Sequence, residues 1–192
     1  MNIHKELYEK YLSKIRRKEI LKKLYPLLKD SKNILDVGCG NGIISKELMR
    51  KEKGLNIKGI DVIDIKDPKI PIKVFDGIKI PFGDNSFDTV IAIDVLHHAK
   101  DLEKLFKEMV RTSKKYIIIK DHYYETKTDY LILKIYDYIG NKPFGVNLPY
   151  KFKKIEEWEK LIKSNNLEKI YFKKFTYKMQ PGKQIIMKLK IK

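Results

Sequence analysis

The sequence predicts one α/β domain organised around a mostly parallel β-sheet. Its 192 residues are enough for a single domain with a substantial core and too few for two ordinary domains. Short apolar runs rich in β-branched residues alternate with segments in which apolar residues recur at helical spacing. Strands that alternate with helices through short connections form parallel sheets on which the helices pack.

The first elements follow from this alternation. Residues 4–25 carry apolar residues at helical spacing and end at Pro26, so they predict an amphipathic opening helix. Residues 33–37 form a short strand of the buried type, and helical spacing resumes over 42–51. The glycines between them therefore form a strand-to-helix turn, the first half of a β-α-β unit.

The middle of the chain continues the pattern, and the tail departs from it. Residues 86–94 contain a dense β-branched run, typical of a central strand covered on both faces. The other predicted strands of the middle span 56–61, 71–77 and 114–121, and a helix spans 101–113. The tail has helices over 126–140 and 155–166, a loop over 141–150, and two strands joined at Pro181-Gly182, a turn that can close a hairpin.

Glycine or aspartate stands at the ends of the predicted parallel strands. Ligands of open α/β sheets bind outside the carboxyl ends of the strands. Those ends hold the glycines of 38–42 and then Asp61, Asp76, Asp94 and Asp121. We therefore expect the ligand site at this edge of the sheet.

The turn after the first strand, ILDVGCGNG at 34–42, holds Gly38, Gly40 and Gly42. A sharp turn alone accounts well for one glycine, because glycine tolerates positive φ. Three glycines favour a ligand that lies against bare main chain, beside the unpaired N–H groups of the next helix. The dinucleotide pattern G-x-G-x-x-G is incomplete because its sixth position is Ile43, which weakens a nicotinamide dehydrogenase interpretation.

Two stretches carry a resemblance to a known family. ILDVGCGNG resembles the nucleotide-binding motif of class I S-adenosylmethionine-dependent methyltransferases, and IPFGDNSFDTVIAIDVLHHAKDLEKLFKEMVR is similar to their small-molecule members. The resemblance covers residues 30–121. It implies a Rossmann-like seven-stranded sheet of order 3-2-1-4-5-7-6, with strand 7 antiparallel and helices on both faces. It also implies S-adenosylmethionine as cofactor and S-adenosylhomocysteine as product.

The resemblance assigns cofactor contacts to particular residues. Asp61 would hold the ribose hydroxyls, Asp76 and Gly77 would meet the adenine, and Asp36 would face the methionyl end. The remaining cofactor candidates are Gly38, Cys39, Gly40, Val62 and Asp94, with Tyr11 and Arg16 of the opening helix near the cofactor carboxylate. Four of these residues have an alternative role: a local turn contact for Asp36, a small filler for Cys39, core packing for Tyr11 and a solvated charge for Arg16.

The acceptor side is predicted from polar residues beyond the fourth and fifth strands. His97, His98, Asp121 and His122 are the catalytic candidates, because an imidazole or carboxylate can orient or deprotonate an acceptor. Packing, helix capping and salt bridging are their alternatives. Tyr136, Asp137, Asn141 and Tyr150 are the candidates for substrate binding, with structural roles equally open. No metal site is predicted, because the single Cys39 excludes a cysteine cluster.

Charge raises a competing function. The net charge is +17, and residues 151–192 hold 13 basic and 4 acidic residues. A solvated lysine-rich face is one explanation, and binding of nucleic acid is another. RNA methylation on ribose or base therefore remains an alternative to a small-molecule acceptor, and a non-catalytic module that binds the cofactor and a partner is a third. Adenine amino methylation is disfavoured because Asp94-Val95-Leu96-His97 replaces N/D-P-P-Y/F, and cytosine C5 methylation because the later cysteines are lacking.

The apolar runs and the N-terminus predict where the protein is located. No apolar run approaches the roughly 20 residues that span a bilayer, and the charged N-terminus lacks the centre of a secretory signal, which favours a cytoplasmic protein. The oligomeric state is left open. Residues 1–192 are expected to form one domain, divided into a helical cover at 1–30, a cofactor-binding core at 31–122, an acceptor-side insertion at 123–154, and a closing helix and hairpin at 155–192.

Overall fold

A computed structural model describes residues 3–142, 148–177 and 181–192, with side-chain surroundings from residue 13 onward. A seven-stranded sheet runs through the molecule in the order β3-β2-β1-β4-β5-β7-β6. The strands are β1 (Asn33–Val37), β2 (Asn56–Asp61), β3 (Ile72–Val74), β4 (Phe87–Ile93), β5 (Ser113–His122), β6 (Leu167–Phe175) and β7 (Gln184–Ile191). The first five strands pair in parallel, whereas β7 is antiparallel to both β5 and β6. The predicted order and the closing hairpin are confirmed.

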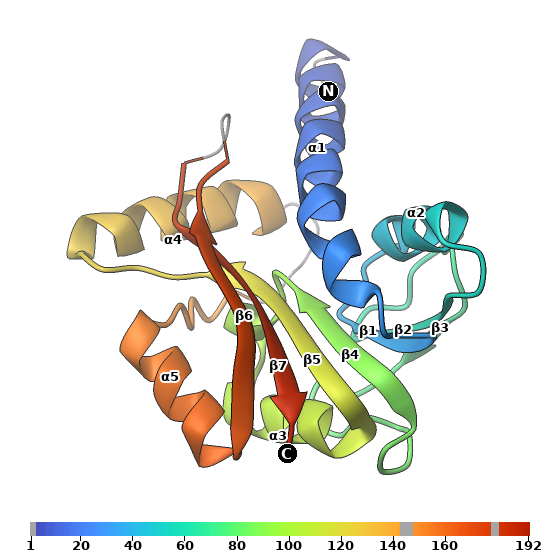
Figure 1. Cartoon of the computed structure of the whole chain (residues 1–192). Coiled ribbons are helices and arrows are strands. Elements are labelled where there is room, and N and C mark those ends of the chain that lie inside the picture. Colours follow the sequence, from blue (N-terminus) through green and yellow to red (C-terminus); the bar gives the residue numbers. More distant parts are fainter. Residues whose placement is uncertain (1–2, 143–147, 178–180) are drawn as a thin grey trace.

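Helices cover both faces of the sheet (Figure 1). They are α1 (Ile3–Leu24), α2 (Ile43–Lys51), α3 (Leu102–Thr112), α4 (Lys127–Asn141) and α5 (Ile155–Ser164), with short 3₁₀ helices η1 (Tyr25–Leu28) and η2 (Leu96–His98). Figure 1 shows α1 and α4 at the edge of the sheet where β4 and β5 end. These two helices therefore stand over the edge at which the sequence predicts the ligand site.

Two apolar clusters fix the two layers. Alternate strand residues point to opposite faces, so Ile91 joins one cluster while its neighbours Val90 and Ala92 join the other. The larger cluster contains the apolar faces of α3 and α5, including Phe106 and Trp158. The smaller cluster contains residues of α1, η1 and α2. The central strands are buried on both faces, as their β-branched runs predict.

The predicted elements differ from the observed ones mainly at their ends. The expected strand over 71–77 is shortened to β3, which pairs only with β2 at the sheet edge and leaves the extended conformation before Gly77, where φ is +79°. The expected helix over 155–166 ends at Ser164, because Asn166 has a φ of +55°. Within the described residues, no helix is both long and apolar enough to cross a membrane.

Candidate functional site

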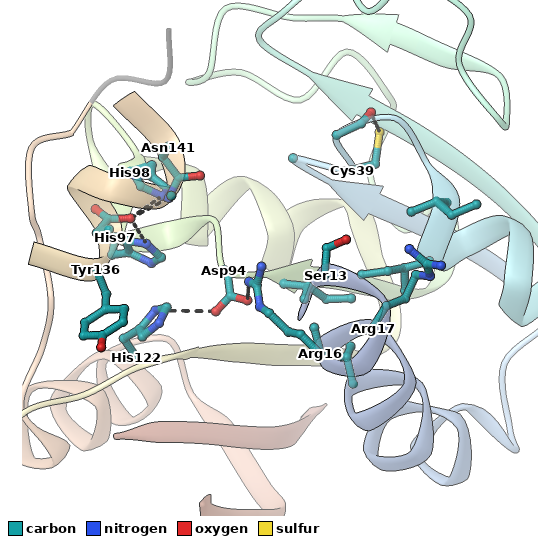
Figure 2. Close-up of a pocket in the computed structure, with 18 of the residues that line it drawn as sticks. Ser13, Arg16, Arg17, Cys39, Asp94, His97, His98, His122, Tyr136 and Asn141 are labelled. Atoms are coloured by element: carbon teal, nitrogen blue, oxygen red, sulfur yellow. Dashed lines mark hydrogen bonds and ion pairs between the residues drawn. The ribbon is translucent and has the colours of Figure 1, made fainter. Parts of the chain in front are cut away.

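A cavity of about 390 Å³ lies at the carboxyl edge of the sheet. Its lining comes from the glycine turn, the end of β4, η2, α4 and the inner face of α1. Figure 2 shows Cys39 at one end of this cavity and His97, His98 and Asn141 at the other, with Arg16 and Asp94 between them. We call these the cofactor end and the acceptor end.

All three glycines of the turn at the cofactor end have a left-handed backbone conformation. Gly38, Gly40 and Gly42 have φ values of +66°, +54° and +74°. A Cβ on Gly38 would lie 2.5 Å from Val95, and one on Gly42 would lie 2.5 Å from Ile70. The expectation that turn geometry explains only one glycine well is therefore wrong, because all three have a left-handed conformation and close packing adds a second reason for glycine at Gly38 and Gly42. Gly40 differs, since an added Cβ meets nothing within 4 Å and the space over it is open.

Two buried carboxylates flank this turn. Asp61 ends β2, and its two oxygens accept hydrogen bonds from the backbone N–H groups of Gly40 at 2.8 Å and Ile63 at 3.1 Å. Asp36, in β1, accepts a 2.6 Å hydrogen bond from the Ser45 hydroxyl at the start of α2. Burial raises the pKa of Asp36 to about 7, against the opposing effect of that hydrogen bond. Asp36 lines the cavity.

The other cofactor candidates have different surroundings, and of Asp76, Gly77, Val62 and Cys39 only Cys39 lines the cavity. Asp76 is exposed, and its carboxylate accepts hydrogen bonds from the N–H groups of Ile78 and Lys79, both at 2.8 Å. Gly77 lies against Val62, which is itself exposed. Cys39 lines the cavity and lies against Gly59, and burial raises the pKa of its thiol. A thiol with a raised pKa is a poor nucleophile, which supports the filler role for Cys39.

Asp94 lies at the centre of the cavity in a network of charges. It follows β4 with a left-handed φ of +56°, a conformation that Asp tolerates better than most residues. Its carboxylate forms ion pairs with Arg16 of α1 and with Lys120 of β5. Burial would raise the pKa of Asp94, but the charges of Lys120 and Arg16 hold it well below its ordinary value. Burial lowers the pKa of Lys120 to about 8, against the attraction of Asp94.

The acceptor end is built around His97. Its Nδ1 lies 2.5 Å from Oδ1 of Asp121, and its Nε2 lies 3.6 Å from Oδ1 of Asp137. Burial would lower the pKa of His97, but the charge of Asp121 and its hydrogen bond raise the pKa to about 9. Nε2 of His98 lies 3.3 Å from the same oxygen of Asp137. The carboxylate of Asp137 also accepts a 2.7 Å hydrogen bond from the side chain of Asn141.

Asp121 connects β5 to this group. Besides His97, its oxygens accept hydrogen bonds from the N–H groups of Leu96 and His122. The carboxylate is fully buried and does not line the cavity. His122 does line it, and burial lowers the pKa of His122 to about 4. Asp121 thus holds η2 against the end of β5, whereas the imidazoles face the cavity.

The remaining candidates divide into those near the cavity and those away from it. Tyr136, Asp137 and Asn141 line the cavity, whereas Tyr150 does not. The carbonyl of Tyr150 instead accepts a hydrogen bond from the hydroxyl of Tyr130. The side chain of Tyr11 falls outside the described part of the chain, so its predicted role stays a prediction.

Three residues of the site were not singled out from the sequence. Lys120 is 1% exposed and pairs with Asp94, although a lysine in a buried strand is unusual. The ring of Tyr177 lies under the ammonium group of Lys120, with 5.0 Å between the ring centroid and Nζ. Phe152 stacks on His97 with ring centroids 5.1 Å apart. A charged residue inside the run KKYIIIKD was the one signal available for Lys120; the other two depend on tertiary contacts.

Known proteins resemble this chain over most of its length. A family profile described as "Methyltransferase domain" matches residues 7–171. Ajmaline N-methyltransferase from Rauvolfia serpentina is 33% identical over 97 residues, which are 44% of this chain and 33% of that protein. Ubiquinone biosynthesis O-methyltransferase from Rickettsia bellii is 28% identical over 166 residues, which are 80% of this chain and 68% of that protein. The chain therefore spans only about a third of the first of these relatives.

A solved structure shows the same fold. The PH0226 protein from Pyrococcus horikoshii has a TM-score of 0.71 at 20% identity, over 95% of this chain and 91% of that chain. The family profile covers well over half of the residues. The chain therefore belongs to the methyltransferase domain family, and it has the class I fold that its motifs predicted.

Proposed function

We propose that this protein transfers a methyl group from S-adenosylmethionine to an oxygen or nitrogen atom of a small molecule. The observation that carries the proposal is one cavity that joins the glycine turn and Asp36 to the polar side chains of η2 and α4. Its volume of about 390 Å³ is within the range usual for small-ligand sites. Cofactor and acceptor can therefore meet in one cavity.

The cofactor end fits the cofactor on its own geometry. The open space above Gly40 leaves bare main chain on which a ligand can lie. Each oxygen of Asp61 accepts one backbone hydrogen bond and keeps a second lone pair, so the carboxylate can accept hydrogen bonds from vicinal ribose hydroxyls. Asp36 places a buried carboxyl group beside the turn for the positively charged methionyl end. Arg16 offers a guanidinium group to the cofactor carboxylate from α1.

When bound, S-adenosylmethionine supplies a methyl group that its sulfonium already activates. The chain's own residues then have to align the acceptor and keep water out. Arg16 holds α1 across the cavity through Asp94, and Phe152 stacks on His97 and so packs against the acceptor end. His97, His98 and Asp137 present polar atoms where the acceptor would lie.

The RNA alternative receives less support from the structure. Basic residues of the tail are partly neutralised by neighbouring acids: Lys169 pairs with Glu159, and Lys174 and Lys183 both pair with Glu125. Paired lysines release fewer counterions from phosphate than free ones. We retain the expectation of a cytoplasmic location and of one domain over 1–192 as predictions.

The experiment has two stages. Calorimetry with S-adenosylmethionine and S-adenosylhomocysteine should give one binding site per chain for each. Methyl-labelled cofactor should then transfer its label to the small-molecule fraction of a cell extract and not to the RNA fraction. Label in RNA would support the competing function, and tight cofactor binding without transfer to any fraction would support the non-catalytic module. No heat with either compound would overturn all three.

A further inference from the structure

Three side chains at the acceptor end bring ligand atoms together. His97 and His98 come from η2, and Asp137 comes from α4. Oδ1 of Asp137 lies 3.6 Å from Nε2 of His97 and 3.3 Å from Nε2 of His98, and all three ligand atoms lie within 4.8 Å of one another. Atoms bound about 2.1 Å from one tetrahedral metal ion lie about 3.4 Å apart. The two distances from Asp137 are close to this spacing, so small side-chain movements would bring all three ligand atoms onto one metal ion.

His97 is held in the orientation of a metal ligand. Its Nδ1 is 2.5 Å from Asp121, which fixes the ring and directs Nε2 toward Asp137, 3.6 Å away. Figure 2 shows His97 beside His98 at one end of the cavity. Nε2 is buried, and within the described residues it has no hydrogen-bond partner. Metal-binding histidines usually donate their other ring N–H to a carboxylate in this way. A buried nitrogen without a partner is costly unless a ligand uses its lone pair or its proton.

The charges of the cluster leave room for a cation. Asp121 and Asp137 place two carboxylates on opposite sides of one imidazole, in a buried region. Either a proton on His97 or a metal ion next to it would supply the positive charge that these groups require. The second oxygen of Asp137 is buried and has no hydrogen-bond partner among the described residues, so the carboxylate has a lone pair to offer.

We propose that His97, His98 and Asp137 bind a divalent transition-metal ion at the acceptor end of the cavity. Two imidazoles and one carboxylate suit Zn²⁺, Fe²⁺, Mn²⁺ or Co²⁺ better than Mg²⁺ or Ca²⁺, which prefer oxygen ligands. Asp121 orients His97, and Asn141 orients Asp137 through its 2.7 Å hydrogen bond. The sequence predicted no metal site, because Cys39 is its single cysteine and no sequence pattern indicates that α4 packs against η2.

A second combination, His97 with Asp121 and His122, is also close enough to hold a metal. It is the poorer site because both oxygens of Asp121 already accept hydrogen bonds from Leu96, His97 and His122. Asp121 is also fully buried and away from the cavity, so neither metal nor acceptor can reach it without displacing those bonds.

Three protein ligands leave open positions on the metal, which an acceptor oxygen can occupy. A role of the metal in holding the acceptor rests on the proposed function. It restricts the acceptor to molecules that have a hydroxyl or carbonyl oxygen beside the methylated atom. Coordination lowers the pKa of a bound hydroxyl group and fixes its position, two requirements of transfer to oxygen. The binding of the metal itself does not depend on the methyl-transfer proposal.

The test is a titration of the chelator-treated full chain with Co²⁺, followed by visible absorption, with Zn²⁺ as competitor. We expect one Co²⁺ per chain, displaced by Zn²⁺. Asp121→Asn should weaken Co²⁺ binding by about 10- to 100-fold, as loss of a ligand-orienting carboxylate typically does. His98→Ala and Asp137→Asn remove ligands and should weaken it further. Asp30→Asn, at a carboxylate that is 70% exposed, is the matched control and should bind as the unchanged chain does.

Binding of S-adenosylhomocysteine by each variant shows that it is folded and separates this proposal from the function. Full Co²⁺ affinity in both His98→Ala and Asp137→Asn, or no Co²⁺ bound by the unchanged chain, would overturn the site. Loss of Co²⁺ in His122→Ala with full affinity in Asp137→Asn would assign the metal to the second combination and also overturn it. Metal binding without cofactor binding would contradict the proposed function and leave the metal site standing.

Discussion

The two ends of the cavity are built on different physical principles. The cofactor end is mostly main chain: a turn over 38–42 whose three glycines are left-handed, anchored by a hydrogen bond from the N–H group of Gly40 to the carboxylate of Asp61. The acceptor end and the centre of the cavity are mostly buried side chains: imidazoles and a carboxylate from η2 and α4, and the pair of Asp94 and Lys120 from the ends of β4 and β5. We therefore expect changes at the cofactor end to act chiefly on binding, and changes in the buried charges to act chiefly on stability.

The largest effect should come from the buried pair between Lys120 and Asp94. Lys120→Met leaves the Asp94 carboxylate with Arg16 and with the imidazole of His122, 3.4 Å away, and loss of one partner of a buried pair costs about 3–5 kcal/mol. The free energy of unfolding in urea measures this loss. The double variant Asp94→Asn with Lys120→Met removes both charges and should recover part of it. A double variant no more stable than Lys120→Met would show that the charge pair is not the cause.

A matched pair of glycine variants tests whether one glycine of the turn matters chiefly for stability and another chiefly for cofactor binding. Gly38→Ala should lose about 2–3 kcal/mol, because its Cβ meets Val95 at 2.5 Å in a left-handed conformation that itself costs about 1–2 kcal/mol. Gly40→Ala carries only the conformational cost, yet its methyl group enters the space proposed for the cofactor. Thermal unfolding and calorimetry with S-adenosylhomocysteine measure the two effects.

Val95→Ala supplies the control for this pair. It removes the two methyl groups that a Cβ on Gly38 would meet, so Gly38→Ala should cost less in its presence. It should leave the effect of Gly40→Ala unchanged. Equal loss of cofactor affinity in Gly38→Ala and Gly40→Ala, with equal stability, would contradict the distinction between a packed and an open glycine.

Asp61→Asn should weaken cofactor binding with a smaller effect on the fold. A hydrogen bond to a charged acceptor contributes about 1.5–3 kcal/mol, so affinity for S-adenosylhomocysteine should fall by about 10- to 100-fold. The amide oxygen of Asn can still accept from Gly40, which limits the structural damage. Calorimetry measures the affinity, with Asp30→Asn as the control. Unchanged affinity would remove Asp61 from the proposed cofactor site.

The difference between a site built from main chain and a site built from buried side chains also explains what could be predicted from the sequence. The order of the sheet and the turn at 38–42 follow from local patterns, because glycine conformation and strand periodicity are properties of a few adjacent residues. The position of Asp61 at the end of β2 was also predicted, whereas its contact with the cofactor stays a prediction. The closeness of Asp137 to His97 and His98 was not predicted. It depends on how α4 packs over η2, and Asp137 and His98 are 39 residues apart in the chain. Tyr150, chosen for its place in the same segment, lies outside the cavity.

Asp36 gives the smallest expected effect, and it links the cofactor end to pH. Burial raises its pKa to about 7, so in the free protein its ionisation lowers stability as the pH rises from about 4 to 7, because the unfolded chain releases this proton first. The positive charge of bound S-adenosylmethionine favours the ionised carboxylate. Affinity should therefore rise about tenfold between pH 6 and 8 and level off above that range.

Calorimetry in two buffers with different ionisation enthalpies measures the proton released when the cofactor binds near pH 6. Asp36→Asn cannot release it, so its affinity should be independent of pH over the same range. Ser45→Ala, which removes the 2.6 Å hydrogen bond to Asp36, should raise the pKa further and move the rise in affinity to higher pH. A flat profile in the unchanged chain would mean that Asp36 is already ionised, and that the cofactor end responds to charge less than its burial implies.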